Sequence, residues 1–233
     1  MESVTKIPFF KEISGDLETP LSIYLKFMDD RNSYLFESVE GGEKWARYSI
    51  IGLPTDKKID LSKNPLKDIE NFLKQNKAQS IPDLPDFHGG LVGYFSYETI
   101  RHIEKKLQNS SKEKLPYPDI SLMVSDEVVI YDNLKKSLFI VVHGTEDTKK
   151  ECHERIELIH KKILEPLPSQ KSSKKGVINF ESSVKKEDYL EAIKKIKNYI
   201  VEGDVMQVVY GQEFSTKFEG SPIDLYRSLR KLN

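Results

Sequence analysis

A glutamine stands at the centre of a strand-like stretch near the end of the chain. The stretch reads GDVMQVVYGQEF and covers residues 203–214. Its alternation predicts a strand with Val205, Gln207 and Val209 on one face, and both faces are largely apolar, as in a strand covered on both sides. An unpaired amide buried there costs roughly a few kcal/mol. Gln207 therefore needs a hydrogen-bonding partner, which is either a ligand that it orients or the surrounding backbone.

Other residues offer little recognisable chemistry. The sequence contains no phosphate-binding GxxxxGK[ST] loop, no HExxH, no GxSxG and no EF-hand loop. His153 and His160 lie about two helical turns apart, which is too far to chelate one metal ion. His88, His102 and His143 are expected at surface or strand-edge positions. These patterns predict no metal site in the chain.

Composition limits the classes of partner. The 233 residues carry 36 lysines and arginines against 37 acidic residues, so nothing favours nucleic acid or an anionic membrane. The single cysteine, Cys152, cannot form an internal disulfide, which fits a reducing compartment. No apolar run has membrane-spanning length, and the start MESVTKIPFF lacks the apolar core of a signal peptide. We expect a soluble, cytoplasmic protein.

Residues 1–165 mix helix and strand patterns. Strands are predicted at 33–39, 45–52, 89–98, 120–132 and 137–144. Helices are predicted after Thr19-Pro20 and Asn64-Pro65 and over 147–164, the last with Ile156, Ile159 and Ile163 facing inward. Turns at 41–44 and Asn133 predict hairpins, and the glycines of GGLVGYFSYE predict close backbone packing. The fold class expected is α+β, with antiparallel sheets flanked by helices.

A second unit follows a polar segment. PLPSQKSSKKG begins a linker assigned to residues 166–182, and residues 183–233 read as the start of another domain. Ser183 is expected to cap a helix that ends at Gly203, and Ser221-Pro222 to open a last helix through a capping box. One strand and two helices leave their apolar faces uncovered. We expect a fragment cut inside its second domain; the alternative is a natural small domain ending in a helix.

Three stretches, in order, resemble anthranilate synthase component I of the chorismate-utilising enzymes. LFESVEGGEKWARYSIIG resembles the LLES…GRYSxIG signature near the start of that family, and GGLVGYFSYE matches its GGxxGYxSYE strand. YIVEGDVMQVVYGQEF resembles the YIxxGDIxQVVxSQRF signature that opens the chorismate-binding domain. Family members are about twice this long, so the resemblance covers their N-terminal part.

The resemblance implies an activity for a longer parent protein. The family converts chorismate and ammonia to anthranilate and pyruvate, with Mg²⁺ holding chorismate and a glutamine amidotransferase subunit supplying the ammonia. Its metal-binding carboxylates and acid–base residues lie beyond position 233. The resemblance therefore implies that this chain alone is inactive and holds no ligand of the Mg²⁺.

Two regions carry residues to which the resemblance assigns roles. The serine of LLES, here Ser38, helps bind L-tryptophan as feedback inhibitor, and Glu37 and Arg47 are expected to line the same pocket; otherwise Ser38 is a polar residue near a strand end. Relatives that add water carry a general-base lysine at the Gln207 position, whereas relatives that add ammonia carry glutamine. Gln207 is accordingly the catalytic candidate, and a glutamine satisfied by backbone remains the alternative.

The sequence departs from the family signatures at several positions. Phe36 replaces a leucine, Ala46 a glycine and Gly211 a serine, and Glu213 reverses the charge of an arginine. Two other functions remain open. Aminodeoxychorismate synthase component I also adds ammonia, although its motif usually reads QVNL where this chain has QVVY. A non-catalytic amino-acid-binding module is the other alternative.

Overall fold

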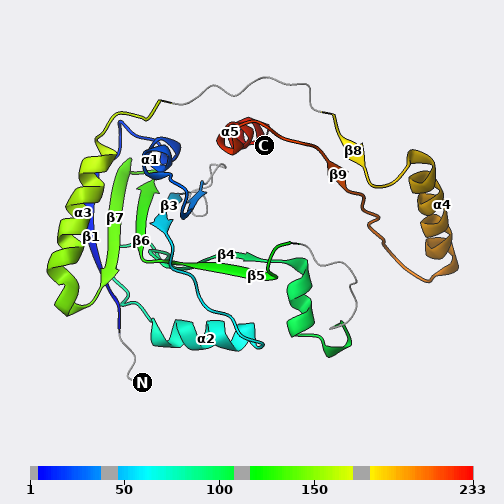
Figure 1. The fold of residues 1–233 in the computed structure, drawn as a ribbon, viewed down its shortest axis with the longest axis horizontal. Helices are drawn as coiled ribbons and strands as arrows, with labels where there is room; N and C mark the ends of the chain where they lie inside the picture. Colours follow the sequence, from blue (N-terminus) through cyan, green and yellow to red (C-terminus); the bar gives the residue numbers. More distant parts are fainter. Residues whose placement is uncertain (1–4, 38–46, 108–115, 170–178, 233) are drawn as a thin grey trace. The chain divides into compact units, whose positions relative to one another are not determined.

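The computed structural model describes residues 5–37, 47–107, 116–169 and 179–232 (Figure 1). The chain divides into two compact units, Met1–Ser169 and Gln170–Asn233. The division falls within the segment 166–182 that the sequence assigns to a linker. Among the described residues, no helix is long and apolar enough to cross a membrane.

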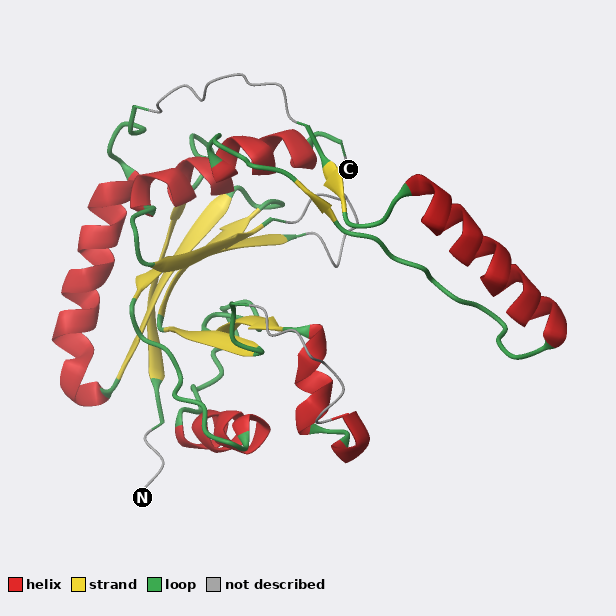
Figure 2. Cartoon of the chain, turned by 45° about the vertical axis from the view of Figure 1, so that its right-hand side comes forward, coloured by secondary structure: helices red, strands yellow, loops and turns green. Residues whose placement is uncertain are grey.

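Two antiparallel sheets form the framework of the first unit, and Figure 2 shows them as separate groups of strands. The larger sheet has the order β1-β7-β6-β3-β2, formed by Ile7–Ser14, Ser137–Gly144, Glu127–Asp132, Tyr48–Thr55 and Asn32–Phe36. The smaller sheet pairs β4 (Gly90–Phe95) with β5 (Ile120–Ser125). Antiparallel pairing of β2 with β3 and of β6 with β7 confirms both predicted hairpin partnerships. The turn at 41–44 lies outside the described residues.

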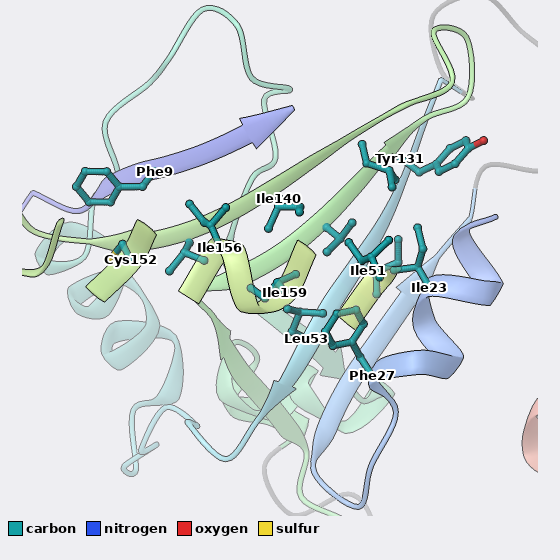
Figure 3. Close-up of a cluster of buried hydrophobic side chains, with 14 residues drawn as sticks. Phe9, Ile23, Phe27, Ile51, Leu53, Tyr131, Ile140, Cys152, Ile156 and Ile159 are labelled. Carbon is teal, nitrogen blue, oxygen red and sulfur yellow. The ribbon is translucent and has the colours of Figure 1, made fainter. Parts of the chain in front are cut away.

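Both faces of the larger sheet are covered by other parts of the first unit. Successive side chains of a strand point to opposite faces, so neighbouring residues of β6 enter different cores. Val129 and Tyr131 of β6 join a core beneath α1 (Pro20–Phe27) and α3 (Lys149–Ile163). Figure 3 shows side chains of these helices and of the strands converging there. The predicted inward residues Ile156, Ile159 and Ile163 are all buried in it, which confirms the helical pattern. Val128 and Ile130 join a second core on the opposite face.

Local signals explain where the elements of the first unit begin. Thr19 caps α1 through a capping box with Ser22, and Pro65 occupies the first turn of α2 (Pro65–Gln75). A Cβ atom on Gly93 would lie 1.9 Å from the carbonyl oxygen of Ser121, which confirms close packing at the predicted glycine strand. Three short 3₁₀ helices complete the described elements of this unit, at Tyr97–His102, Lys105–Leu107 and Glu146–Thr148.

The second unit has helices where the pattern predicts them. They are α4 (Lys186–Glu202) and α5 (Pro222–Arg230), and two-residue strands β8 (Glu181–Ser182) and β9 (Phe214–Ser215) pair with each other. Gly203 ends α4 with φ of 84°, a left-handed conformation suited to glycine.

Two predicted caps in the second unit are wrong. Lys185, not Ser183, occupies the N-cap of α4. The Ser183 hydroxyl instead accepts a hydrogen bond from the backbone N–H of Glu213 at 3.0 Å. Ser221 occupies the N-cap of α5, but its side chain makes no capping bond, so the predicted capping box is absent.

The predicted buried strand over residues 203–214 is also wrong. Residues 204–213 form an irregular segment, and only Phe214 belongs to a strand, β9. Val205 and Tyr210 are partly covered and the other residues of this segment are exposed. A strand requires neighbours that pair with it and cover its faces, and the described residues of this unit offer it only the two residues of β8.

Candidate functional site

The β2–β3 pair brings two of the predicted effector-site residues to one end of the larger sheet. Phe36 pairs with Ile50, so Glu37 follows the end of β2 where Arg47 precedes β3. Both side chains are partly exposed. Ser38 lies outside the described residues. Glu37 and Arg47 are therefore near the same strand ends.

Arg47 is held by a buried carboxylate. Its Nε and Nη2 atoms donate to Oδ2 of Asp132 at 3.0 and 2.6 Å, and Asp132 is fully buried. Oδ1 of Asp132 accepts the backbone N–H groups of Leu134 and Lys135, both at 3.0 Å. The Arg47 guanidinium also lies over the ring of Tyr48, 4.9 Å from its centroid. Arg47 thus ties the start of β3 to the β6–β7 turn.

The partners of Asp132 set its charge. Burial alone would raise its pKa, but the Arg47 hydrogen bonds and the two backbone N–H groups outweigh that effect and hold the pKa below its usual value. The same interaction raises the pKa of Arg47. Two of the five N–H donors of Arg47 face Asp132, so any contact with an effector carboxylate uses the others.

Gln207 belongs to the second unit, where it is exposed in the segment between α4 and β9. Nearby contacts attach this segment to the rest of the unit. The Tyr189 hydroxyl of α4 donates to the carbonyl of Tyr210 at 3.4 Å, and the Ser182 hydroxyl donates to Oε1 of Gln212 at 3.0 Å. Among the described residues, no buried pocket surrounds Gln207. A catalytic role for Gln207 would need further protein around it.

Sequence reasoning missed a contact between two histidines in the first unit. Nδ1 of His88 lies 3.0 Å from Nε2 of His143, and Nδ1 of His143 lies 3.0 Å from the carbonyl oxygen of Asp126. A carbonyl only accepts, so Nδ1 of His143 carries a proton and its Nε2 accepts from His88 when both rings are neutral. Because 55 residues separate the two histidines, no local spacing could predict the contact.

Burial lowers the pKa of both His88 and His143. For His143, the backbone contact with Asp126 raises the pKa, whereas the neighbouring His88 and the more weakly acting Lys6 lower it; burial prevails. A proton on Nε2 of His143 would also place two N–H donors against each other, because that atom accepts from Nδ1 of His88. The neutral pair is the form that fits the fold.

We expect the free energy of unfolding to decrease at acidic pH, because His88 and His143 become protonated. Unfolded histidines have a pKa near ~6.5, and the folded values are lower, so the stabilisation is complete above that pH and is lost as pH falls through the folded values. The melting temperature should drop by about 3 °C between pH 7 and pH 5.5. His88→Phe should reduce this drop, and His153→Phe, at an exposed position of α3, should not. An equal drop in the His88→Phe protein would contradict the assignment.

Sequence comparison relates the chain to enzymes that act on chorismate. Residues 31–233 match the model of a family described as chorismate binding enzyme. The chain is 40% identical over 260 residues to anthranilate synthase component 1 of Pseudomonas aeruginosa, covering 100% of this chain and 53% of the relative. It is 39% identical over 252 residues to the protein of that name from Acinetobacter calcoaceticus, covering 97% and 50% respectively. The chain spans about half the length of these relatives.

A solved structure has a similar fold. The crystal structure of anthranilate synthase component I from Streptococcus pneumoniae superposes with a TM-score of 0.68 at 20% identity, covering 95% of this chain and 52% of that one. The antiparallel sheets with flanking helices therefore agree with a known architecture, which confirms the expected fold class.

Proposed function

Because this chain belongs to the family of chorismate binding enzymes, we propose that it is the N-terminal part of the large subunit of an anthranilate synthase. The observation that carries the proposal is identity near 40% along the whole chain to proteins of that name. The parent would be a cytoplasmic lyase of tryptophan biosynthesis that converts chorismate and ammonia to anthranilate and pyruvate. A glutamine amidotransferase subunit would release the ammonia from glutamine.

The isolated chain is proposed to be inactive. Gln207, the catalytic candidate, is exposed in an irregular segment. No described side chains form a group of three or more histidines, cysteines or acidic residues that could hold a metal ion. The described residues thus do not fit the Mg²⁺ of the family, and we assign no step of the reaction to a metal held by them.

The first unit is proposed to form one wall of a feedback site for L-tryptophan. Glu37 and Arg47 lie at the same strand ends, and Ser38 follows Glu37 directly in the sequence. A serine hydroxyl and neighbouring backbone groups suit the ammonium and carboxylate of an amino acid. The Arg47–Asp132 ion pair would keep the start of β3 fixed at this wall.

The experiment uses a fusion enzyme, defined as this chain joined to the part of the Pseudomonas aeruginosa relative that it does not cover. Ser38→Ala in the fusion enzyme should raise the tryptophan concentration for half-inhibition about tenfold, because one hydrogen bond to a charged ligand is worth roughly 1.5–3 kcal/mol. The measurement is the rate of anthranilate formation against tryptophan concentration.

The matched control is Ser62→Ala. Ser62 is an exposed serine outside the β2–β3 pair, so inhibition should be unchanged. Equal sensitivity of the Ser38→Ala and unaltered fusion enzymes to tryptophan would count against the effector site, although not against the synthase activity.

One observation supports a non-catalytic amino-acid-binding module as second candidate. The first unit has its own cores on both faces of the larger sheet and also holds Glu37 and Arg47. Calorimetry of tryptophan with the 233-residue chain separates the two functions. Micromolar binding favours a module that works alone, and undetectable binding favours part of an enzyme. The rival enzyme, aminodeoxychorismate synthase component I, is distinguished by its product.

A further inference from the structure

A cavity of about 250 Å³ lies within the first unit, lined by residues from the end of α2, the start of β1 and the β4–β5 pair. Figure 1 labels these elements. Its apolar lining comes mainly from Phe72, Leu73 and Val124. Its charged lining comes from Lys6, Lys77 and Asp126. At ~30 Å³ per water molecule, this volume corresponds to about eight waters. It suits a ligand of one ring with one small substituent.

Backbone contacts hold the walls of this cavity in place. The N–H of Lys6 donates to the carbonyl of Lys77 at 3.1 Å, and the N–H of Gln79 donates to the carbonyl of Lys6 at 2.9 Å. The side-chain amide of Asn76 donates to the carbonyl of Phe72 at 3.0 Å. The segment that follows α2 is therefore fixed to the residue that precedes β1, and a ligand would find its site already formed.

Charge around the cavity favours an anion. Nζ of Lys6 and Nζ of Lys57 lie 2.5 and 3.0 Å from the two oxygens of Asp126. Burial would raise the pKa of Asp126, but the two lysines outweigh it and keep the carboxylate ionised. Lys77 is exposed and has no ion pair with any described residue. The described lining thus carries two cations, Lys6 and Lys77, against the one carboxylate of Asp126, which Lys57 also neutralises from outside the lining.

The one histidine in the lining adds no charge and no free donor. Nδ1 of His143 faces the carbonyl of Asp126, and its Nε2 accepts from His88. The neutral ring therefore acts as a flat wall. Gly89 lies against it, with φ of +154°, and a Cβ there would approach Cε1 of His143 to 2.5 Å. Position 89 therefore has no room for a side chain. The polar groups left to bind a ligand are the charged side chains of the lining.

We propose that this cavity binds a small aromatic monocarboxylate. The ring would pack on Phe72, Leu73 and Val124, and the carboxylate would pair with Lys77 and Lys6. A ligand with an ammonium group is disfavoured, because Asp126 is the only carboxylate in the described lining and already has two lysine partners. The site is distinct from the proposed tryptophan site and does not depend on it.

Benzoate is the probe. Titrating the 233-residue chain with benzoate should give saturable amide NMR shifts at Val124, Gly90 and Lys77, with a dissociation constant of about 1 mM or below. Benzyl alcohol, which has the same ring without the charge, should bind at least fivefold more weakly. Excess L-tryptophan should leave the benzoate shifts unchanged.

Variants test the charge directly. Lys77→Glu should weaken benzoate binding at least fivefold, whereas Lys67→Glu, which makes the same charge change at an exposed position of α2 outside the cavity, should not. Lys77→Gln supplies a milder variant should Lys77→Glu disturb the fold. Absence of saturation up to about 10 mM benzoate, equal affinity for benzyl alcohol, or unchanged affinity in both Lys77 variants would overturn the proposal.

Discussion

Asp132→Ala is expected to destabilise the first unit by about 3 kcal/mol. Asp132 is fully buried and receives two hydrogen bonds from Arg47 and two from the backbone of the β6–β7 turn. Its removal leaves the turn N–H groups without their acceptor, at roughly 1–3 kcal/mol for each group that stays buried. It also separates the start of β3 from the β6–β7 turn. Urea unfolding followed by circular dichroism measures the loss.

The control for this prediction is Asp60→Ala. Asp60 is exposed, and a surface substitution of this kind changes stability by less than about 0.5 kcal/mol. Acid supplies a second check, because the lowered pKa of Asp132 means that its stabilisation is complete above the unfolded value and is lost as pH falls through the folded value. Equal stability of the Asp132→Ala and Asp60→Ala proteins would show that the ion pair contributes nothing.

The second unit is expected to show little protection from hydrogen exchange. The isolated 233-residue chain is expected not to turn over chorismate. No described residue between 179 and 232 is buried, although α4 and α5 present apolar side chains such as Ile200 and Leu229. Helices without tertiary packing are marginal in water. Amides of α4 should exchange at least ~100-fold faster than those of β6 and β7.

Mass spectrometry after deuterium labelling measures this exchange, and fluorescence of anthranilate measures turnover. The amides of β6 serve as the internal reference, since that strand is buried on both faces. Protection of α4 equal to that of β6, together with anthranilate formed by the 233-residue chain, would contradict the proposal that this unit needs further protein to work.

Elements of the first unit could be predicted because their local patterns and their burial agree. Thr19-Pro20 marked the start of α1, and the spacing of Ile156, Ile159 and Ile163 marked the inner face of α3. Each of these patterns lies within one helix or at its first residues, so a short stretch of sequence contains it whole. The β6–β7 hairpin around Asn133 was predictable for the same reason, since its two strands are close in sequence.

Features that depend on distant partners could not be predicted. The alternation around Gln207 predicted a strand, but strand formation requires partners that the described residues do not supply. The His88–His143 contact depends on how β7 lies beside the segment before β4, which no spacing reveals. The resemblance implies a ligand pocket for Arg47, whereas its ion pair with Asp132 follows from the pairing of β3 with β6.

The most direct test of the proposed function is the product formed by the fusion enzyme. With chorismate, ammonium and Mg²⁺, the fusion enzyme should form anthranilate and pyruvate in equal amounts, and the 233-residue chain under the same conditions should form neither. A folded fusion enzyme that yields aminodeoxychorismate, or no product while the intact Pseudomonas aeruginosa protein is active, would contradict the assignment of this chain to an anthranilate synthase.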